Sequence, residues 1–177
     1  MNTELVNLYT QKIKAHIQQG KQYFVVCEAE YTNKEGSQIM DDLIKDNSLL
    51  EKYDVRLVAT HKNNSITSDP KSMSKTLLEV KGESKKVLIL IENYELLDYD
   101  IREIILNRLK DENNEFIFVI HTHYLAQQSR ELVNVVENAR HKYERFNISA
   151  QCHESIIEKA RNKYNARDFY DRYLLIK

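Results

Sequence analysis

Two apolar runs, VLILIEN at residues 87–93 and FIFVIHT at residues 116–122, indicate the fold of this chain. Each run is continuously apolar and then ends abruptly in polar side chains. The residues between the two runs carry apolar positions at helical spacing. Because strands that are buried on both faces read as continuous apolar runs, the pattern predicts two neighbouring strands of a parallel sheet joined by a helix.

The same alternation of strands and helices extends over most of the chain. We expect strands at residues 23–27, 55–59, 87–91, 116–120 and, more weakly, 146–149. A helix should begin with Thr3 as its N-cap and stop at Gly20, and further helices should lie around residues 39–44, 73–78, 101–109, 125–136 and 156–164. This alternation predicts an α/β fold, a three-layer sandwich with a mainly parallel sheet of about five strands.

Length and composition bound the class of protein. The chain has 177 residues, which fits one domain, with a core at residues 1–150 and a short lid-like or tail segment at residues 151–177. A net charge of -1 gives no overall basic bias towards nucleic acid. No apolar run approaches the ~20 residues of a membrane span. The two cysteines, Cys27 and Cys152, lie far apart in the sequence, so we expect a reduced, cytoplasmic protein without membrane attachment.

The order of these elements resembles the AAA+ branch of the P-loop NTPases, from Thr3 to Tyr164. It runs helix, strand, loop, helix, strand, helix, strand ending in an acid, helix, and strand ending in polar residues. The short strand and amphipathic helix after Phe146 are similar to the start of an AAA+ lid. The resemblance implies a P-loop NTPase-like core with a truncated lid.

The stretch that matches the phosphate-binding Walker A loop departs from the family pattern. It reads EAEYTNKEGS at residues 28–37, and no G-x-x-x-x-G-K-[ST] occurs anywhere in the chain. One register places Lys34 at the family's lysine, and the other places Glu35 there. Three carboxylates, Glu28, Glu30 and Glu35, crowd this loop, and each pair of like charges ~4 Å apart costs ~1 kcal/mol in water and more near a protein surface. We therefore expect no tightly bound nucleotide and no cofactor.

The strand ends that match the Walker B and sensor positions are also altered. The resemblance places Glu92 at the family's Asp and Asn93 at its catalytic Glu, and an asparagine side chain cannot serve as a general base. His121 or Thr122 falls near the sensor position. If a nucleotide were bound, the resemblance implies that it would be contacted by Lys34, Ser37, Glu92, Asn93, His121 and Thr122, with no catalytic residue. Together with Glu28, the strand-end residues should converge on one edge of the sheet.

Four other patterns suggest different chemistry. LLEVKG at residues 77–82 resembles the E-x-K element of restriction-like nucleases, in which acids hold Mg²⁺ and a lysine steadies the attacking water. Its site residues would be Asp69, Glu79 and Lys81, although a helix end at Gly82 explains the same pattern. His121 and His123 with Glu92 could form a metal site, and Cys152-His153 a nucleophile pair, but ordinary structural roles are favoured for both. Basic clusters at residues 140–145 and 159–167 allow nucleic-acid contact, although glutamates are interspersed among them.

The function that these observations favour is non-catalytic. We expect an accessory or interaction protein on a degenerate AAA+-like scaffold, one that binds a protein or nucleoprotein partner such as an AAA+ ATPase or a replication complex. Such a chain would suit a phage or mobile element. Two alternatives remain: an ATP-binding protein or ATPase with an atypical phosphate loop, and an Mg²⁺-dependent nuclease. Nucleic-acid binding and oligomerisation are left open.

Overall fold

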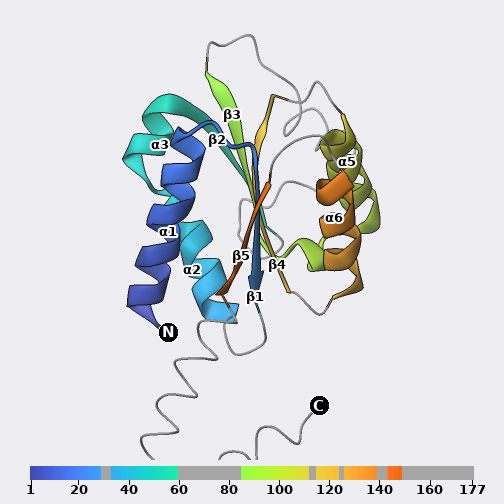
Figure 1. The fold of residues 1–177 in the computed structure, drawn as a ribbon, viewed down its shortest axis with the longest axis horizontal. Coiled ribbons are helices and arrows are strands. Elements are labelled where there is room, and N and C mark those ends of the chain that lie inside the picture. The colour runs from blue at the N-terminus through green and yellow to red at the C-terminus, as the bar shows by residue number, and fades with distance from the viewer. Residues whose placement is uncertain (29–32, 60–84, 112–114, 124–125, 139–142, 149–177) are drawn as a thin grey trace, which may run out of the picture.

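A single sheet of five strands forms the centre of the molecule (Figure 1). The computed structural model describes residues 1–28, 33–59, 85–111, 115–123, 126–138 and 143–148. The strands are β1 (Tyr23–Glu28), β2 (Tyr53–Val58), β3 (Lys86–Ile91), β4 (Ile117–His123) and β5 (Tyr143–Asn147). They lie in the order β2-β3-β4-β1-β5, and every neighbouring pair is parallel. The predicted parallel α/β sheet is confirmed.

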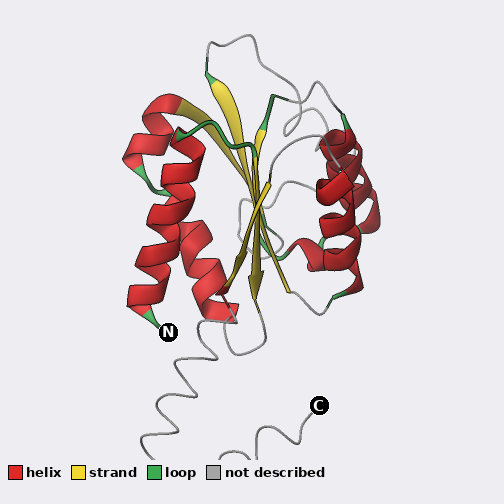
Figure 2. Cartoon of the chain, in the orientation of Figure 1, coloured by secondary structure: helices red, strands yellow, loops and turns green. Residues whose placement is uncertain are grey.

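Helices cover both faces of the sheet and complete the three layers (Figure 2). One face carries α1 (Thr3–Gln18), α2 (Asn33–Ile44) and α3 (Asn47–Lys52). The other carries the short 3-10 helix η2 (Tyr94–Leu96) together with α5 (Tyr99–Lys110) and α6 (Gln127–Asn138). None of the helices in the described ranges is both long and apolar enough to cross a membrane.

Alternating side chains of the central strands fill two cores. In β1, Phe24 and Val26 pack with α1 and α2, whereas Tyr23 and Val25 pack with α5 and α6. All four of these side chains are at most 1% exposed. Because β1, β3 and β4 are buried on both faces, their sequences lack the apolar-polar alternation of a half-exposed strand.

The boundaries of several elements differ from the expected ones. The N-cap of α1 is Asn2, whose side chain accepts a hydrogen bond from the backbone N–H of Leu5, and Thr3 is already helical. Gly20 ends this helix with a φ of 82°, as expected for a glycine stop. The helix α3 was not predicted, because its six residues are too short to show a helical period.

Two strands also begin or end elsewhere. The strand β4 continues to His123, because its ladder with β1 runs on to the pair Glu28 and His123. His121 and Thr122 therefore lie inside the strand instead of after it. The strand β5 begins at Tyr143, ahead of the expected residue 146. The expected helices at residues 73–78 and 156–164 lie outside the described residues.

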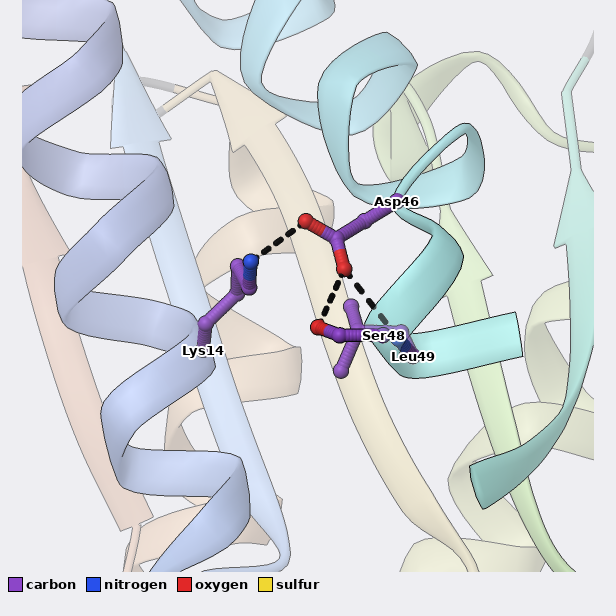
Figure 3. A network of polar contacts seen from close by, with 4 residues as sticks. All are labelled: Lys14, Asp46, Ser48 and Leu49. Atoms are coloured by element: carbon purple, nitrogen blue, oxygen red, sulfur yellow. Dashed lines mark hydrogen bonds and ion pairs between the residues drawn. The ribbon is translucent and has the colours of Figure 1, made fainter. Parts of the chain in front are cut away.

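A carboxylate joins α1 to the start of α3 (Figure 3). Asp46 accepts hydrogen bonds from Lys14 Nζ at 2.5 Å, from Ser48 Oγ at 2.5 Å and from the backbone N–H of Leu49 at 3.1 Å. Burial alone would raise the pKa of Asp46, but the three hydrogen bonds outweigh it and lower that pKa. This contact ties the outer helix α1 to the turn that follows α2.

Candidate functional site

The carboxyl ends of β1, β3 and β4 meet at one edge of the sheet. Ile91, the last residue of β3, pairs with Ile120 of β4, and His121 pairs with Val26 of β1. The backbone N–H of Glu92 donates to the carbonyl oxygen of Val58 at 2.8 Å, so this residue still continues the pairing of β3 with β2. Glu92, Asn93, His121 and Thr122 are thereby brought to the same edge.

The polar groups at this edge are buried. Glu92 is 7% exposed, and His121 and Thr122 are fully buried. Successive strand residues point to opposite faces, so His121 faces the core beneath α1 and α2, as Val119 does, and Thr122 faces α6. The two residues considered for one sensor position therefore serve different sides of the sheet.

Asn93 turns the chain sharply at the end of β3. Its φ of 51° is the only positive one among the non-glycine residues that the structure describes, and asparagine tolerates this left-handed conformation better than most residues do. Its backbone N–H donates to Nδ1 of His121 at 3.4 Å. Because Nδ1 accepts this bond, a neutral His121 carries its proton on Nε2.

A hydrogen-bond network that the sequence did not reveal fastens η2 to β4. Glu95 Oε2 accepts from the Thr122 hydroxyl at 2.7 Å and from the backbone N–H of His123 at 3.1 Å. The hydroxyls of Thr122 and Ser129 lie 2.7 Å apart, and Ser129 donates to the carbonyl oxygen of His123. The Thr122 hydroxyl thus links η2, β4 and α6. No sequence pattern marks Glu95, because its partners are distant in the chain.

The start of α2, where the resemblance places phosphate binding, is organised around another carboxylate. Glu35 is 6% exposed, and its Oε1 accepts a hydrogen bond from the backbone N–H of Asn2 at 2.6 Å. The amino group of Met1 lies 3.9 Å from the same oxygen. Lys34 is exposed and Ser37 is half-buried. Of the three loop carboxylates, Glu35 alone has a described side chain, and it is bonded to the start of α1.

The remaining candidate sites gain no support in the described part of the chain. There, no three His, Cys, Asp or Glu side chains gather so that they could hold a metal ion. The nuclease residues Asp69, Glu79 and Lys81 and the Cys152-His153 pair lie outside the described residues. Within the first basic cluster, Glu144 forms an ion pair with Lys21, and the hydrogen bond from Lys21 lowers the pKa of Glu144. Arg145 is exposed.

Comparison with known proteins shows a likeness of fold only. No family model and no curated protein sequence matches this chain. The DNA polymerase III gamma subunit-related protein of Thermotoga maritima is similar in structure, with a TM-score of 0.50 and 11% identity. The match covers 84% of this chain and 49% of that one, so this chain spans about half of its length.

A Drosophila ORC chain, solved in a complex with DNA, is also similar, with a TM-score of 0.45 and 11% identity. That match covers 82% of this chain and 90% of the other. The five-stranded parallel sheet flanked by helices is an α/β fold like that of the Thermotoga maritima protein.

Proposed function

We propose that this chain is a non-catalytic accessory or interaction protein of the cytoplasm, built on an AAA+-like fold, that binds a protein or nucleoprotein partner. The observation that carries the proposal is the buried Glu35 carboxylate in the first turn of α2. A helix start that binds phosphate presents its backbone N–H groups and its positive dipole end to the anion. A buried carboxylate in that turn, already bonded to Asn2, offsets this attraction and repels a triphosphate.

The strand ends support the same conclusion. Asn93 stands where the resemblance calls for a general base, and its amide side chain cannot take a proton from water. The Thr122 hydroxyl, one of the two sensor candidates, is already bonded to Glu95 and close to Ser129. A polar group that is committed to internal hydrogen bonds can contact a nucleotide only by breaking them.

The setting of the proposed partner rests on the fold comparison. The neighbour from Thermotoga maritima is a DNA polymerase III gamma subunit-related protein, whose name connects a fold of this kind with a replication polymerase. We infer that the partner is a component of a replication-type assembly, such as an AAA+ ATPase. The catalytic work would then be performed by the partner.

Thermal unfolding with millimolar ATP and Mg²⁺ tests the loss of nucleotide binding. A nucleotide at ~100 times its Kd would add ~2.7 kcal/mol to the free energy of unfolding. We expect no shift of the unfolding temperature. The matched variants are Lys34→Ala in the first turn of α2 and Lys45→Ala, an equally exposed lysine just beyond the last turn of the same helix. A shift that Lys34→Ala abolishes and Lys45→Ala preserves would contradict the proposal and favour the ATP-binding alternative.

A further inference from the structure

The segment that follows β3 presents two large apolar side chains to solvent. Leu96 is 56% exposed and Tyr99 is 66% exposed. The described residues include three other large hydrophobic side chains that are exposed, Met1, Leu8 and Leu50, and each of these is at least seven positions from any other exposed one. Leu96 and Tyr99 are three positions apart. Both exposed side chains are thus carried by one short segment, whereas singly scattered exposed apolar residues are ordinary on a protein surface.

The backbone that carries this pair is held firmly. Tyr94 and Leu97, which alternate with the exposed residues, are 1% and 4% exposed and pack into the core beneath α5 and α6. Arg102 donates a hydrogen bond to the carbonyl oxygen of Leu97. Glu95 is bonded to Thr122 and to the backbone of His123. The exposure of Leu96 and Tyr99 therefore belongs to an ordered segment, and a pre-ordered surface loses less entropy when it binds.

Two exposed carboxylates stand near this pair, and the nearest cation in the sequence, Arg102, is bonded to the carbonyl oxygen of Leu97. Of the four acidic residues in positions 92–101, Glu92 is buried and Glu95 is bonded to Thr122, so Asp98 and Asp100 are the two that face solvent. Asp98 and Asp100 are exposed and flank Tyr99. Asp98 occupies the N-cap position of α5, yet its side chain makes no capping hydrogen bond. Its carboxylate is thus not used by the helix that it precedes.

We propose that Leu96, Tyr99, Asp98 and Asp100 form a docking surface for a basic segment of a partner protein, one in which Lys or Arg flanks an apolar side chain. The apolar pair would receive the apolar side chain, and the two aspartates would attract the cations. Nucleic acid is disfavoured because its phosphates would meet the aspartates. A symmetric contact with a second copy is disfavoured because it would place the same acidic surface on both sides. This surface rests on the proposed accessory function and specifies its partner.

Site-specific photo-crosslinking in cells that produce the full chain tests the surface. Benzoylphenylalanine replaces Tyr99 in one variant and Leu8 in the control, because Leu8 is 45% exposed and lies on α1, on the other face of the sheet. The crosslinked peptides are identified by mass spectrometry. We expect the Tyr99 variant to form an adduct with a segment of another protein that combines Lys or Arg with an apolar residue.

Binding of the purified crosslinked partner then gives the quantitative test. Tyr99→Ala and Leu96→Ala should each weaken the Kd about tenfold or more, as expected for central apolar anchors, while Leu8→Ala leaves it unchanged. The double variant Asp98→Asn with Asp100→Asn should bind more weakly at low salt and lose most of the salt dependence of the Kd. All five substituted residues are exposed, so thermal unfolding of each variant should match that of the parent chain.

The outcomes separate this surface from the function on which it rests. An adduct of the Tyr99 variant with an acidic segment, with nucleic acid, with a second copy or with this chain itself would overturn the surface. A partner crosslinked only through the Leu8 position would overturn the surface and leave the accessory function standing. No adduct at either position would overturn the surface, and ATP stabilisation that depends on Lys34 would overturn the accessory function as well.

Discussion

Three carboxylates, Glu35, Asp46 and Glu95, each accept hydrogen bonds from an element other than their own. Their donors lie in the segment before α1, in α1 and in β4, respectively. Hydrogen bonds to a charged acceptor are stronger than neutral ones, and partial exposure to solvent reduces what each contributes to stability. These acids therefore hold the helical layers and the strand ends in place.

The contact of Asp46 with Lys14 yields a prediction on stability. Asp46→Asn should lower the free energy of unfolding at pH 7 by about 0.5–1 kcal/mol, because asparagine still caps α3 but cannot pair with the lysine. Asp46→Ala should cost about 1 kcal/mol more, because it also removes the cap. Urea denaturation measures both differences. Equal losses in the two variants would show that the cap contributes nothing.

The lowered pKa of Asp46 gives the pH dependence of the same contact. Because the folded pKa lies below the unfolded value of about 4, the stabilisation is fully present above that value and is lost as the pH falls through the folded pKa. The difference in stability between the parent chain and Asp46→Asn should therefore shrink in acid. Urea denaturation at pH 6 and at about pH 3 compares them, and a difference that grows in acid would contradict the assignment.

Two buried threonines differ in whether their side-chain hydroxyl makes a hydrogen bond. Thr122 donates to Glu95, whereas the buried Oγ1 of Thr10 in α1 has no hydrogen-bond partner in the part of the chain that is described. Thr122→Val should cost about 1–3 kcal/mol, since it leaves Glu95 short of a donor, and Thr10→Val should be neutral or stabilising. Chemical denaturation of the two variants checks this, and a larger loss for Thr10→Val would refute the network's importance.

At the scale of elements, the edge strand β5 is joined to α1 and β1 by aromatic packing. Phe146 lies 5.8 Å from Tyr9 in an edge-on arrangement and 6.4 Å from Phe24 in a stacked one, measured between ring centroids. It also lies 5.8 Å from His16. These rings connect the beginning of the described chain to its end.

Removing that ring should loosen the attachment of β5. Phe146 is 8% exposed, so Phe146→Ala should lower the free energy of unfolding by about 3–5 kcal/mol, and Phe146→Leu by less, because leucine fills part of the cavity. Leu8 is exposed on α1, so Leu8→Ala should change the free energy of unfolding by less than about 0.5 kcal/mol. Calorimetry of the three variants tests the order, and a loss as small as that of Leu8→Ala would contradict the packing.

The sequence predicted most strands to within two or three residues, because buried parallel strands carry continuous apolar runs. The weakest strand prediction and the missed helix share a physical cause. The strand β5, with the sequence YERFN, has charged side chains at an edge, so its apolar signal is weak. The six-residue helix α3 shows no period, and its N-cap Asp46 was its one local sign. Short and edge elements depend on tertiary contacts that periodicity does not encode.

For the candidate site, the sequence located the polar residues at the strand ends but not the residues to which they are hydrogen-bonded. The rule that parallel strands end at one edge placed Glu92, Asn93, His121 and Thr122 together. The contacts Glu95 to Thr122 and Glu35 to Asn2 join residues that are far apart in the sequence, and neither follows from a local pattern. The sequence did not predict that His121 and Thr122 point to opposite faces of the sheet, because the expected strand ended before them. In the structure β4 continues to His123 and includes both.

At the scale of the whole molecule, three interior strands lie between two edge strands. Backbone amides in β1, β3 and β4 have neighbours on both sides, whereas β2 and β5 border the described sheet. We expect hydrogen exchange to be slowest in the three interior strands and faster in β2 and β5. Exchange followed by mass spectrometry measures this. Amides of β2 that exchange as slowly as those of β1 would indicate an additional neighbour for that edge.

The position of β1 between β4 and β5 also has a consequence for how the protein is made. Tyr23 pairs with Phe118 on one side and with Tyr143 on the other. A ribosome that adds ~5–20 residues per second needs roughly 6–23 s to travel from the end of β1 to the start of β5. Throughout that interval the nascent β1 lacks at least one of its two neighbouring strands. Synthesis of this chain therefore exposes an aggregation-prone apolar segment early and covers it late. Ribosome-associated chaperones relieve this situation.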